Sequence, residues 1–469
     1  MNERHFFFFS AIIKIPNPPF ANMSCNIAQM TSVIDDVLHC LDEDGSLFHG
    51  DYACHTPFMI QVQTWELSSP KFGKDNSTEI GKVGDFLYKI IAQVDFAKLS
   101  AFYTAPSLTW DPVAATDGLT TAQETYLDSL TVGAVRNAAV QPHYQDGAAL
   151  ALFQNTTLRI NNSPIDCLKP SLMNMEWEQS SSSYRNLGES VNKGRTVLQM
   201  QTATSAGLRC QVSLPFFHTY SAFTAYPLSA HGNIKYVIQA KLAKLEDLLQ
   251  YPYGKSITGL SVSATNMEAN TSIKYHSMQI TVSDFERDSV WEASNDLLVV
   301  MQQMAFDAET VAAGTGAHKK KFTLTGSGPV RAIHFWFAPG SLTDEDATYF
   351  TTLSGFGYNA GESFDNADLA INTQKVHDTL SSEFLRDASA EIFGTRRPDG
   401  RYYSFYQCLV PRDYFQPSGS QAMFRNETVT LTVHWDATRA ACEFNCAIEY
   451  YNRLRIKKGA IGCMLPVPC

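Results

Sequence analysis

Short stretches of alternating apolar and polar residues recur along most of the chain. Residues 60–67 (IQVQTWEL) are one example and residues 86–96 are another. Alternation with a period of two is typical of a β-strand that buries one face. The same reasoning predicts strands at residues 150–160, 197–214, 234–240, 273–282, 322–324, 330–337 and 429–435. Because turn-forming residues separate these stretches at intervals of about ten residues, the pattern favours antiparallel sandwiches or barrels.

Helical signals are few. Residues 294–307 predict a helix, because Ser294 is suited to cap it and apolar residues recur three and four positions apart. Residues 373–386 and 242–249 show weaker helical patterns. Strands and helices do not alternate regularly, which argues against a doubly wound parallel sheet.

Two segments predict long loops, at residues 103–126 and 176–194. Loops of this length in a compact domain are usually functional or disordered. Residues 312–321 (AAGTGAHKKK) differ in composition from both sides and are interpreted as a linker between two domains.

Composition and charge narrow the class of protein. Of the 469 residues, 44% are hydrophobic and 12% are aromatic, which is enough to fill one or two cores and excludes a disordered chain. No apolar run approaches the roughly 18 residues of a membrane-spanning helix. The net charge of −11 argues against direct binding of nucleic acid, because such a surface repels phosphate backbones.

The usual signatures of catalysis and cofactor binding are missing from the sequence. It contains no GxGxxG, GxxxxGK[ST], HExxH or GxSxG motif, so we expect no catalytic residues, no cofactor and no metal. The spacing of Cys442, Cys446, Cys463 and Cys469 leaves a zinc site open as an alternative, but no histidine of matching spacing accompanies them. We interpret the ten cysteines as reduced and mostly buried thiols.

One group of motifs is more specific than composition. Residues 78–86 (TEIGKVGDF) precede an alternating strand and resemble the I-x-R-x-G-D-L segment of the major capsid proteins of nucleocytoplasmic large DNA viruses and related polinton-like and virophage-type viruses. Residues 135–137 and 150–166 resemble the strand pair that ends in E-I-G-G-x-x-I-D. Residues 214–217 (LPFF) and 225–228 resemble the L-P-F-F-F…A-L-P-L passage.

The resemblance continues in the family's order through the rest of the chain. Residues 281–292, with Asp284, Glu286 and Arg287, resemble the L-D-x-x-E-R-x-x-F segment at the end of the first barrel. The remaining matches are residues 321–337, which contain Pro329; residues 417–423 with 429–431, which resemble P-S-G-S-I-N-M-S-R…L-T-L; and residues 451–456 with Gly459, which resemble Y-N-V-L-R-I-x-x-G.

The resemblance implies an all-β fold of two consecutive eight-stranded antiparallel jelly-roll barrels with short helices and long loops. The expected organisation is an N-terminal arm at residues 1–44, a first jelly roll with long insertion loops at 45–311, and a linker, second jelly roll and C-terminal tail at 312–469. The motif positions expected to have structural roles are Gly84, Asp85, Leu214, Pro215, Phe216, Phe217, Pro329, Pro417, Ser418, Gly419, Asn452, Leu454 and Arg455. We expect the glycines to supply positive φ in strand connections.

The function implied by the resemblance is that of a non-enzymatic major capsid protein in the virion shell. Three copies would form a homotrimeric, pseudo-hexameric capsomer, and capsomers would tile an icosahedral shell. The expected partners are further copies of the chain, minor capsid and penton proteins, and an internal membrane. The alternative is a carbohydrate-binding or carbohydrate-active β-sandwich protein, and a hydrolase of that kind would need two buried carboxylates about 5 to 10 Å apart in an aromatic-lined cleft.

Overall fold

In the computed structural model of the chain, the described residues belong to a unit that begins at Thr56, and the predicted N-terminal arm lies outside them. The described residues are 57–67, 69–104, 142–179, 191–195, 197–230, 235–250, 261–293, 297–326, 328–339, 350, 352, 361–372, 374–411, 417–422, 428–457 and 460–463. Within these ranges, no helix is long and apolar enough to cross a membrane.

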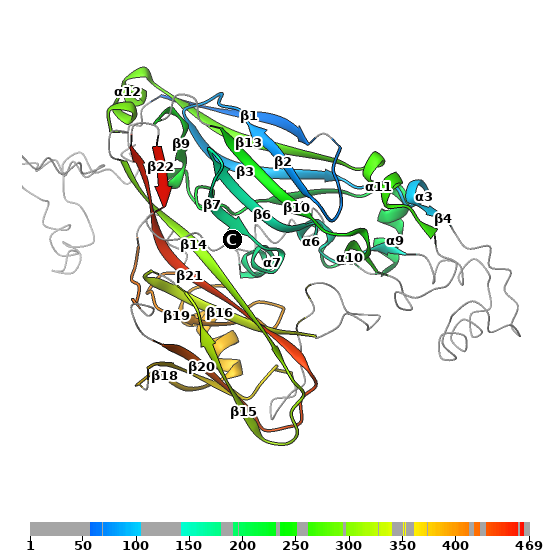
Figure 1. Cartoon of the computed structure of the whole chain (residues 1–469), viewed down its shortest axis with the longest axis vertical. Coiled ribbons are helices and arrows are strands. Elements are labelled where there is room, and N and C mark those ends of the chain that lie inside the picture. Colours follow the sequence, from blue (N-terminus) through cyan, green and yellow to red (C-terminus); the bar gives the residue numbers. More distant parts are fainter. Residues whose placement is uncertain are drawn as a thin grey trace, which may run out of the picture. The chain divides into compact units, whose positions relative to one another are not determined.

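The first half of the described chain forms two main antiparallel sheets (Figure 1). One sheet has the order β1 (Phe58–Leu67), β13 (Ser272–Val282), β3 (Phe86–Asp95) and β8 (Arg209–Ser213), and β9 (Tyr226–Pro227) also pairs with β3. The other has the order β2 (Asp75–Ile80), β10 (Tyr236–Leu242), β6 (Phe153–Ile160) and β7 (Ser163–Leu168).

The second half repeats this arrangement. One sheet has the order β14 (Leu297–Val311), β21 (Cys442–Lys457), β16 (Val330–Pro339) and β19 (Tyr403–Tyr406), with β22 (Ala460–Cys463) also on β21. The other has the order β15 (His318–Leu324), β20 (Val429–Trp435), β17 (Asn366–Ile371) and β18 (Gln374–Ser381). If the eight main strands of each half are numbered in chain order, both halves have sheets 1-8-3-6 and 2-7-4-5, which is the jelly-roll topology.

Short elements connect these strands. They are α3 (Leu99–Phe102), β4 (Tyr103–Thr104), β5 (His143–Tyr144), α6 (Ala148–Ala151), α7 (Pro170–Gln179), α9 (Val197–Ala206), η2 (Ala222–Thr224), η3 (Leu228–Ala230), α10 (Leu245–Leu248), β11 (Leu249–Gln250), β12 (Ser261–Val262), α11 (Ala264–Asn270), α12 (Asp284–Ala293), the π-helix η4 (Phe384–Ala388) and α13 (Ser389–Ile392). The small strands β11 and β12 pair with β5 and β4.

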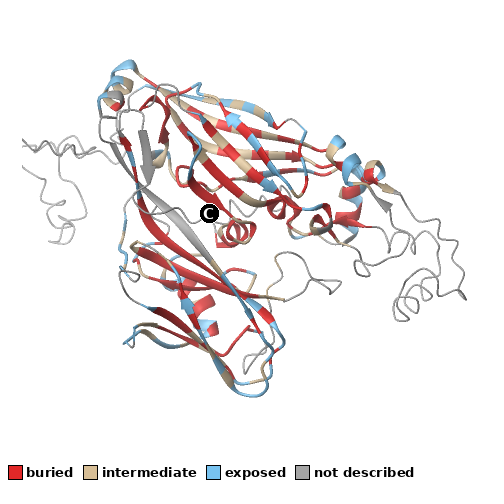
Figure 2. Ribbon diagram, viewed as in Figure 1, coloured by how far each residue is buried: buried red, intermediate tan, exposed pale blue. Residues whose placement is uncertain are grey.

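Each jelly roll has its own core between its two sheets (Figure 2). Leu87 and Tyr275 from one sheet and Leu158 and Ile238 from the other are fully buried in the first core. The second core is aromatic: the Phe335 ring lies 5.5 Å from those of Phe364 and Tyr403 and 6.2 Å from that of Phe444, measured between centroids. The alternating strand pattern and the all-β, two-barrel fold are therefore confirmed.

Two predicted helices are wrong. Residues 294–307 fall largely in β14, which pairs residue by residue with β21 from Leu297 opposite Ile456 to Val311 opposite Cys442. Residues 374–381 form β18, which pairs with β17, and a helical segment begins only at Phe384. In both places the backbone pairs with an antiparallel neighbouring strand, and this tertiary pairing outweighs a weak local helical preference.

Three further expectations change in detail. The predicted strand at 197–214 is the helix α9 followed by the short strand β8. The predicted helix at 242–249 shrinks to the four residues of α10. The basic end of the predicted linker lies in β15. The strand β14 comes before the predicted boundary at residue 312, but it pairs with β21 of the second jelly roll. Most of the two predicted long loops (residues 105–126 and 180–190) lies outside the described residues.

Candidate functional site

Asp85 connects three elements of the first jelly roll. Its Oδ1 accepts a hydrogen bond from Arg287 Nε at 2.7 Å, and its Oδ2 accepts one from the Val282 backbone N–H at 3.0 Å. The start of β3 is thus tied to the end of β13 and to α12. Burial opposes ionisation of this carboxyl, but hydrogen bonds from Arg287 and Val282 outweigh it and hold the pKa of Asp85 below its usual value.

Gly84 is required by close approach rather than by its φ angle. The expected positive φ does not occur at Gly84, although it does at Gly419, where φ is +136°. A Cβ at Gly84 would lie 2.9 Å from the Cβ of Gln279 and 3.0 Å from the carbonyl oxygen of Ile280. The Gln279 side chain also accepts the Gly84 N–H at 2.7 Å, so the backbone is held against β13.

We therefore expect Gly84→Ala to lower the free energy of unfolding by about 1–3 kcal/mol, because the added methyl group must displace β13. Denaturant unfolding measures this change. Gly361→Ala is the matched control, since a Cβ there would meet nothing closer than 3.8 Å, and its effect should stay within about 0.5 kcal/mol. Equal effects of the two substitutions would contradict the steric account of Gly84.

The motif at residues 214–217 forms a buried turn after β8. Leu214, Phe216 and Phe217 lie in the first core, and Pro215 is half-exposed. Asp166 is the last residue of the matching segment 150–166. Its carboxylate accepts the Phe217 N–H at 2.9 Å and the Cys167 N–H at 2.9 Å. The structure thus brings together two motif segments that are about fifty residues apart in sequence.

This turn lies beside two buried titratable groups. Burial raises the pKa of Asp166 to about 7, against the opposing effect of its backbone hydrogen bonds. Burial also lowers the pKa of His218 to about 4, against its hydrogen bond to the Tyr88 carbonyl. Between pH 3.8 and about 7, Asp166 therefore stays protonated in the folded chain and is ionised in the unfolded chain. Between about pH 4 and 6.5, His218 stays neutral in the folded chain and is charged in the unfolded chain.

The raised pKa of Asp166 predicts a loss of stability with rising pH. The contribution of its bound proton is fully present below the unfolded value of 3.8 and is lost as the pH rises through about 7. The contribution of neutral His218 runs the other way: it is present above 6.5 and lost as the pH falls through about 4. In Asp166→Asn, the Tm relative to the unmodified protein should rise between about pH 4 and about pH 7, while His218 cancels in the comparison. A Tm difference that does not change with pH would contradict this prediction.

The motif positions from Pro329 and β21 have different surroundings. The Pro329 carbonyl accepts the Tyr451 N–H at 3.0 Å, and Asn452 is buried with its Oδ1 accepting the Arg453 N–H at 2.7 Å. Leu454 is buried in the first core, whereas Arg455 is exposed.

The Pro417–Gly419 turn lies on the surface and holds a neighbouring loop. Ser418 Oγ accepts the Val410 N–H at 2.9 Å and donates to the Val410 carbonyl at 3.1 Å, while Pro417 and Gly419 are exposed. This turn belongs to the second jelly roll, whereas Asp85 and Asp166 belong to the first.

The contact between the two jelly rolls is the site that sequence reasoning missed. Leu172 and Met175 on α7 pack in one buried cluster with Trp336, Tyr402 and Ala447 of the second jelly roll. Trp336 and Ala447 lie on the outer face of β16 and β21, since their neighbours Phe335 and Cys446 point into the second core. Only the last residues of α7 (Pro170–Gln179) fall within the predicted loop at 176–194. Pro170 at the first helical position and the spacing of Leu172 and Met175 were the available signals.

Polar groups surround this cluster. Asn174 Nδ2 donates to the Tyr402 hydroxyl at 2.8 Å, and Glu178 Oε2 accepts the Gly400 N–H at 2.8 Å. Lys193 Nζ donates to Glu178 Oε1 at 2.9 Å and lies 4.6 Å from the centre of the Trp177 ring. This buried, hydrogen-bonded ion pair lies at the junction of the two jelly rolls and helps to hold them together.

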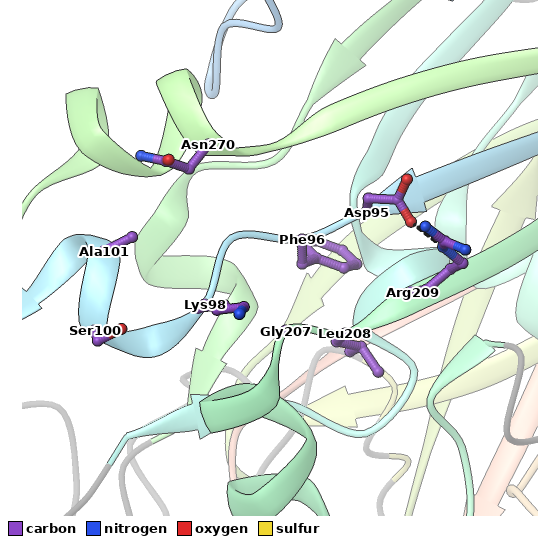
Figure 3. A pocket seen from close by; sticks show the side chains of 9 residues that line it. All are labelled: Asp95, Phe96, Lys98, Ser100, Ala101, Gly207, Leu208, Arg209 and Asn270. Carbon is purple, nitrogen blue, oxygen red and sulfur yellow. Dashed lines mark hydrogen bonds and ion pairs between the residues drawn. The ribbon is translucent and has the colours of Figure 1, made fainter.

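A surface pocket of about 540 Å³ lies where β3, α3, α11 and β8 meet (Figure 3). Asp95 is the one carboxylate among the residues that line it, and it pairs with Arg209 at 2.5 Å. Burial opposes ionisation of Asp95, but the hydrogen bonds from Arg209 and Gln93 lower its pKa. The pocket therefore lacks the carboxylate pair that glycoside hydrolysis requires.

Metal binding finds no support in the described part of the chain, where no group of three or more His, Cys, Asp or Glu side chains could hold an ion. Cys442 and Cys446 are buried in the second core as free thiols. The side chains of Cys463 and Cys469, the other members of the candidate zinc set, lie outside the described residues.

Comparisons with known proteins agree with this architecture. Residues 286–462 match the family model of the large eukaryotic DNA virus major capsid protein. Similar solved structures include the PBCV-1 virus capsid (17% identity, TM-score 0.65, covering 90% of this chain and 100% of that one) and the Faustovirus major capsid protein (13%, 0.66, 92% and 96%). The mavirus major capsid protein is similar at 8% identity, with a TM-score of 0.51 and coverage of 97% and 98%. No curated protein matches the sequence.

Proposed function

We propose that this chain is a double jelly-roll major capsid protein of the large eukaryotic DNA virus family, and that three copies of it associate into a capsomer with a pseudo-sixfold outline. The observation that carries the proposal is the repeated strand order, because two equivalent barrels per chain turn a closed ring of three chains into a ring of six similar units. Capsomers of this kind would tile the icosahedral shell of the virion.

A purely structural role is the second part of the proposal. Most of the buried carboxylates that the structure describes serve as internal ties: Asp85 pairs with Arg287, Glu178 with Lys193, Glu362 with Arg386 and Glu449 with Arg331. Each pairing fixes one element against another, and none of these carboxylates lines the pocket at Asp95. This use of carboxylates supports a protein without catalytic activity over the carbohydrate-active alternative.

The proposed partners are first the neighbouring capsomers and then the minor capsid and penton proteins and an internal membrane. The net charge of −11 supports a shell whose protein does not bind the genome directly. The contacts between capsomers need only be weak, since many of them act together in a closed shell.

Electron microscopy of the purified full-length protein tests the proposal. Class averages should show a roughly hexagonal particle with threefold symmetry. Isolated particles of one chain, together with hydrolysis or binding of polysaccharides, would favour the carbohydrate-active alternative and overturn the capsid function.

A further inference from the structure

The pocket at the end of β3 is lined by two cationic side chains and one carboxylate. Lys98 and Arg209 carry the positive charges, Asp95 carries the negative charge, and no other charged residue lines the pocket. Its volume of about 540 Å³ is in the range of small-molecule sites. The pocket is therefore locally positive, although the chain as a whole has a net charge of −11.

Asp95 holds Arg209 in place without using all of its hydrogen-bond donors. The two residues lie directly opposite each other on β3 and β8, and Arg209 Nε donates to Asp95 Oδ1 at 2.5 Å. The other oxygen of Asp95 accepts hydrogen bonds from Gln93 at 3.1 Å and Ser272 at 3.4 Å. The Arg209 side chain is 71% exposed, and its two terminal amino groups have no partner among the described residues. A guanidinium that is fixed in this way can still bind a second anion through its terminal amino groups.

Lys98 brings a second cation to the same pocket. Its Nζ forms no hydrogen bond or ion pair with the part of the chain that the structure describes. The lysine stem lies close to Gly207, because a Cβ at that glycine would be 3.1 Å from Lys98 Cγ. The backbone beneath is held by the Phe96 N–H, which donates to the Leu208 carbonyl at 2.8 Å. The stem is thus confined while the ammonium group stays available to a ligand.

The rest of the lining adds an apolar floor and two polar groups. Phe96 and Leu208 are each 4% exposed, and in Figure 3 they lie between the two cationic side chains. Ser100 supplies a hydroxyl group, and Asn270 supplies an amide whose Nδ2 donates to the Asn266 carbonyl at 2.8 Å. The hydroxyl and the amide oxygen can hydrogen-bond the polar remainder of a ligand.

We propose that this pocket binds a tetrahedral oxyanion, the sulfate or phosphate group of a ligand, between Arg209 and Lys98. Such a group presents three acceptor oxygens, so it can bind the terminal amino groups of Arg209 and the ammonium group of Lys98 together. Asp95 is a positioning residue, because it acts on the ligand only through Arg209. All these residues belong to the first jelly roll of one chain, so the site does not depend on the proposed trimer.

Calorimetric titration of the full-length protein tests the site, with inorganic phosphate as one probe and a sulfated tetrasaccharide as the other. Arg209→Gln should weaken binding at least about tenfold, because it removes charge-assisted hydrogen bonds. Lys98→Met breaks no ion pair of the folded chain and should weaken binding at least about threefold. Lys235→Met is the matched control, since it removes a 70% exposed cation that pairs with Glu79, and it should bind like the unmodified protein. Circular dichroism melting checks that each variant is folded.

The two probes separate the sources of the anion. Equal affinity for both would assign the site to the free ion, and tighter binding of the tetrasaccharide would assign it to an anion carried by a larger ligand. Binding of either probe should also weaken as salt is added above about 0.01 M, because the two cations are exposed. The absence of binding by both probes at low salt would overturn the site, as would equal affinities of Arg209→Gln, Lys98→Met and Lys235→Met.

Discussion

Replacing Lys193 by Met is expected to lower the free energy of unfolding by about 3–5 kcal/mol. The Lys193 and Glu178 side chains are 10% and 5% exposed, so the substitution leaves a buried carboxylate without its cation. Glu178 also holds the Gly400 N–H of the second jelly roll, and the loss should therefore weaken the contact between the two barrels. Denaturant unfolding followed by fluorescence measures the change.

The pair Lys71–Glu268 is the matched control for this prediction. Its N–O distance is also 2.9 Å, but the Lys71 side chain is 52% exposed, and Lys71→Met should cost less than about 1 kcal/mol. In the double variant Glu178→Gln/Lys193→Met, part of the stability should return, because no charge remains buried without a partner. Equal costs for Lys193→Met and Lys71→Met would show that burial does not govern the Lys193 contact.

Replacing Trp336 by Ala is expected to cost about 3–5 kcal/mol and to loosen α7 specifically. Trp336 is buried against Leu172 and Met175 of α7, and its ring lies 5.4 Å from that of Tyr402. Removal of the indole opens a cavity between the jelly rolls rather than inside either core. Amide hydrogen exchange should therefore show faster exchange in α7 under native conditions.

The neighbouring residue supplies the control for this substitution. Phe335 points to the opposite side of β16 and is fully buried in the second core, so Phe335→Ala should cost a similar amount. Its effect on exchange should centre on the second jelly roll, with α7 less affected than in Trp336→Ala. If both variants changed the exchange of α7 alike, the contact would not depend on the outer face of β16.

Local pattern predicted the strands that bury one face and failed where a distant partner decides the structure. The alternation at residues 60–67 and 273–282 was sufficient, because β1 and β13 each have an inner and an outer face. The pattern at residues 294–307 looks helical, and only the fifteen-residue pairing with β21 makes it a strand. The contact of α7 with Trp336 joins residues more than 160 positions apart, and no local pattern carries it.

The candidate positions were found through resemblance, but their partners were not. Asp85 and Arg287 lie in two separate motif segments, and the structure shows that they form one ion pair at 2.7 Å. Gly84 was expected to supply positive φ, whereas its role is to let β13 approach closely. The placement of the N-terminal arm stays a prediction, whereas β14, which lies before the predicted boundary at residue 312, pairs within the second jelly roll.

The mass of the purified full-length chain in solution tests the central claim most directly. One chain has a mass of 52.1 kDa, and multi-angle light scattering should give about three times this value, unchanged on moderate dilution. A mass of 52.1 kDa at all accessible concentrations would contradict a capsomer built from three copies of the chain.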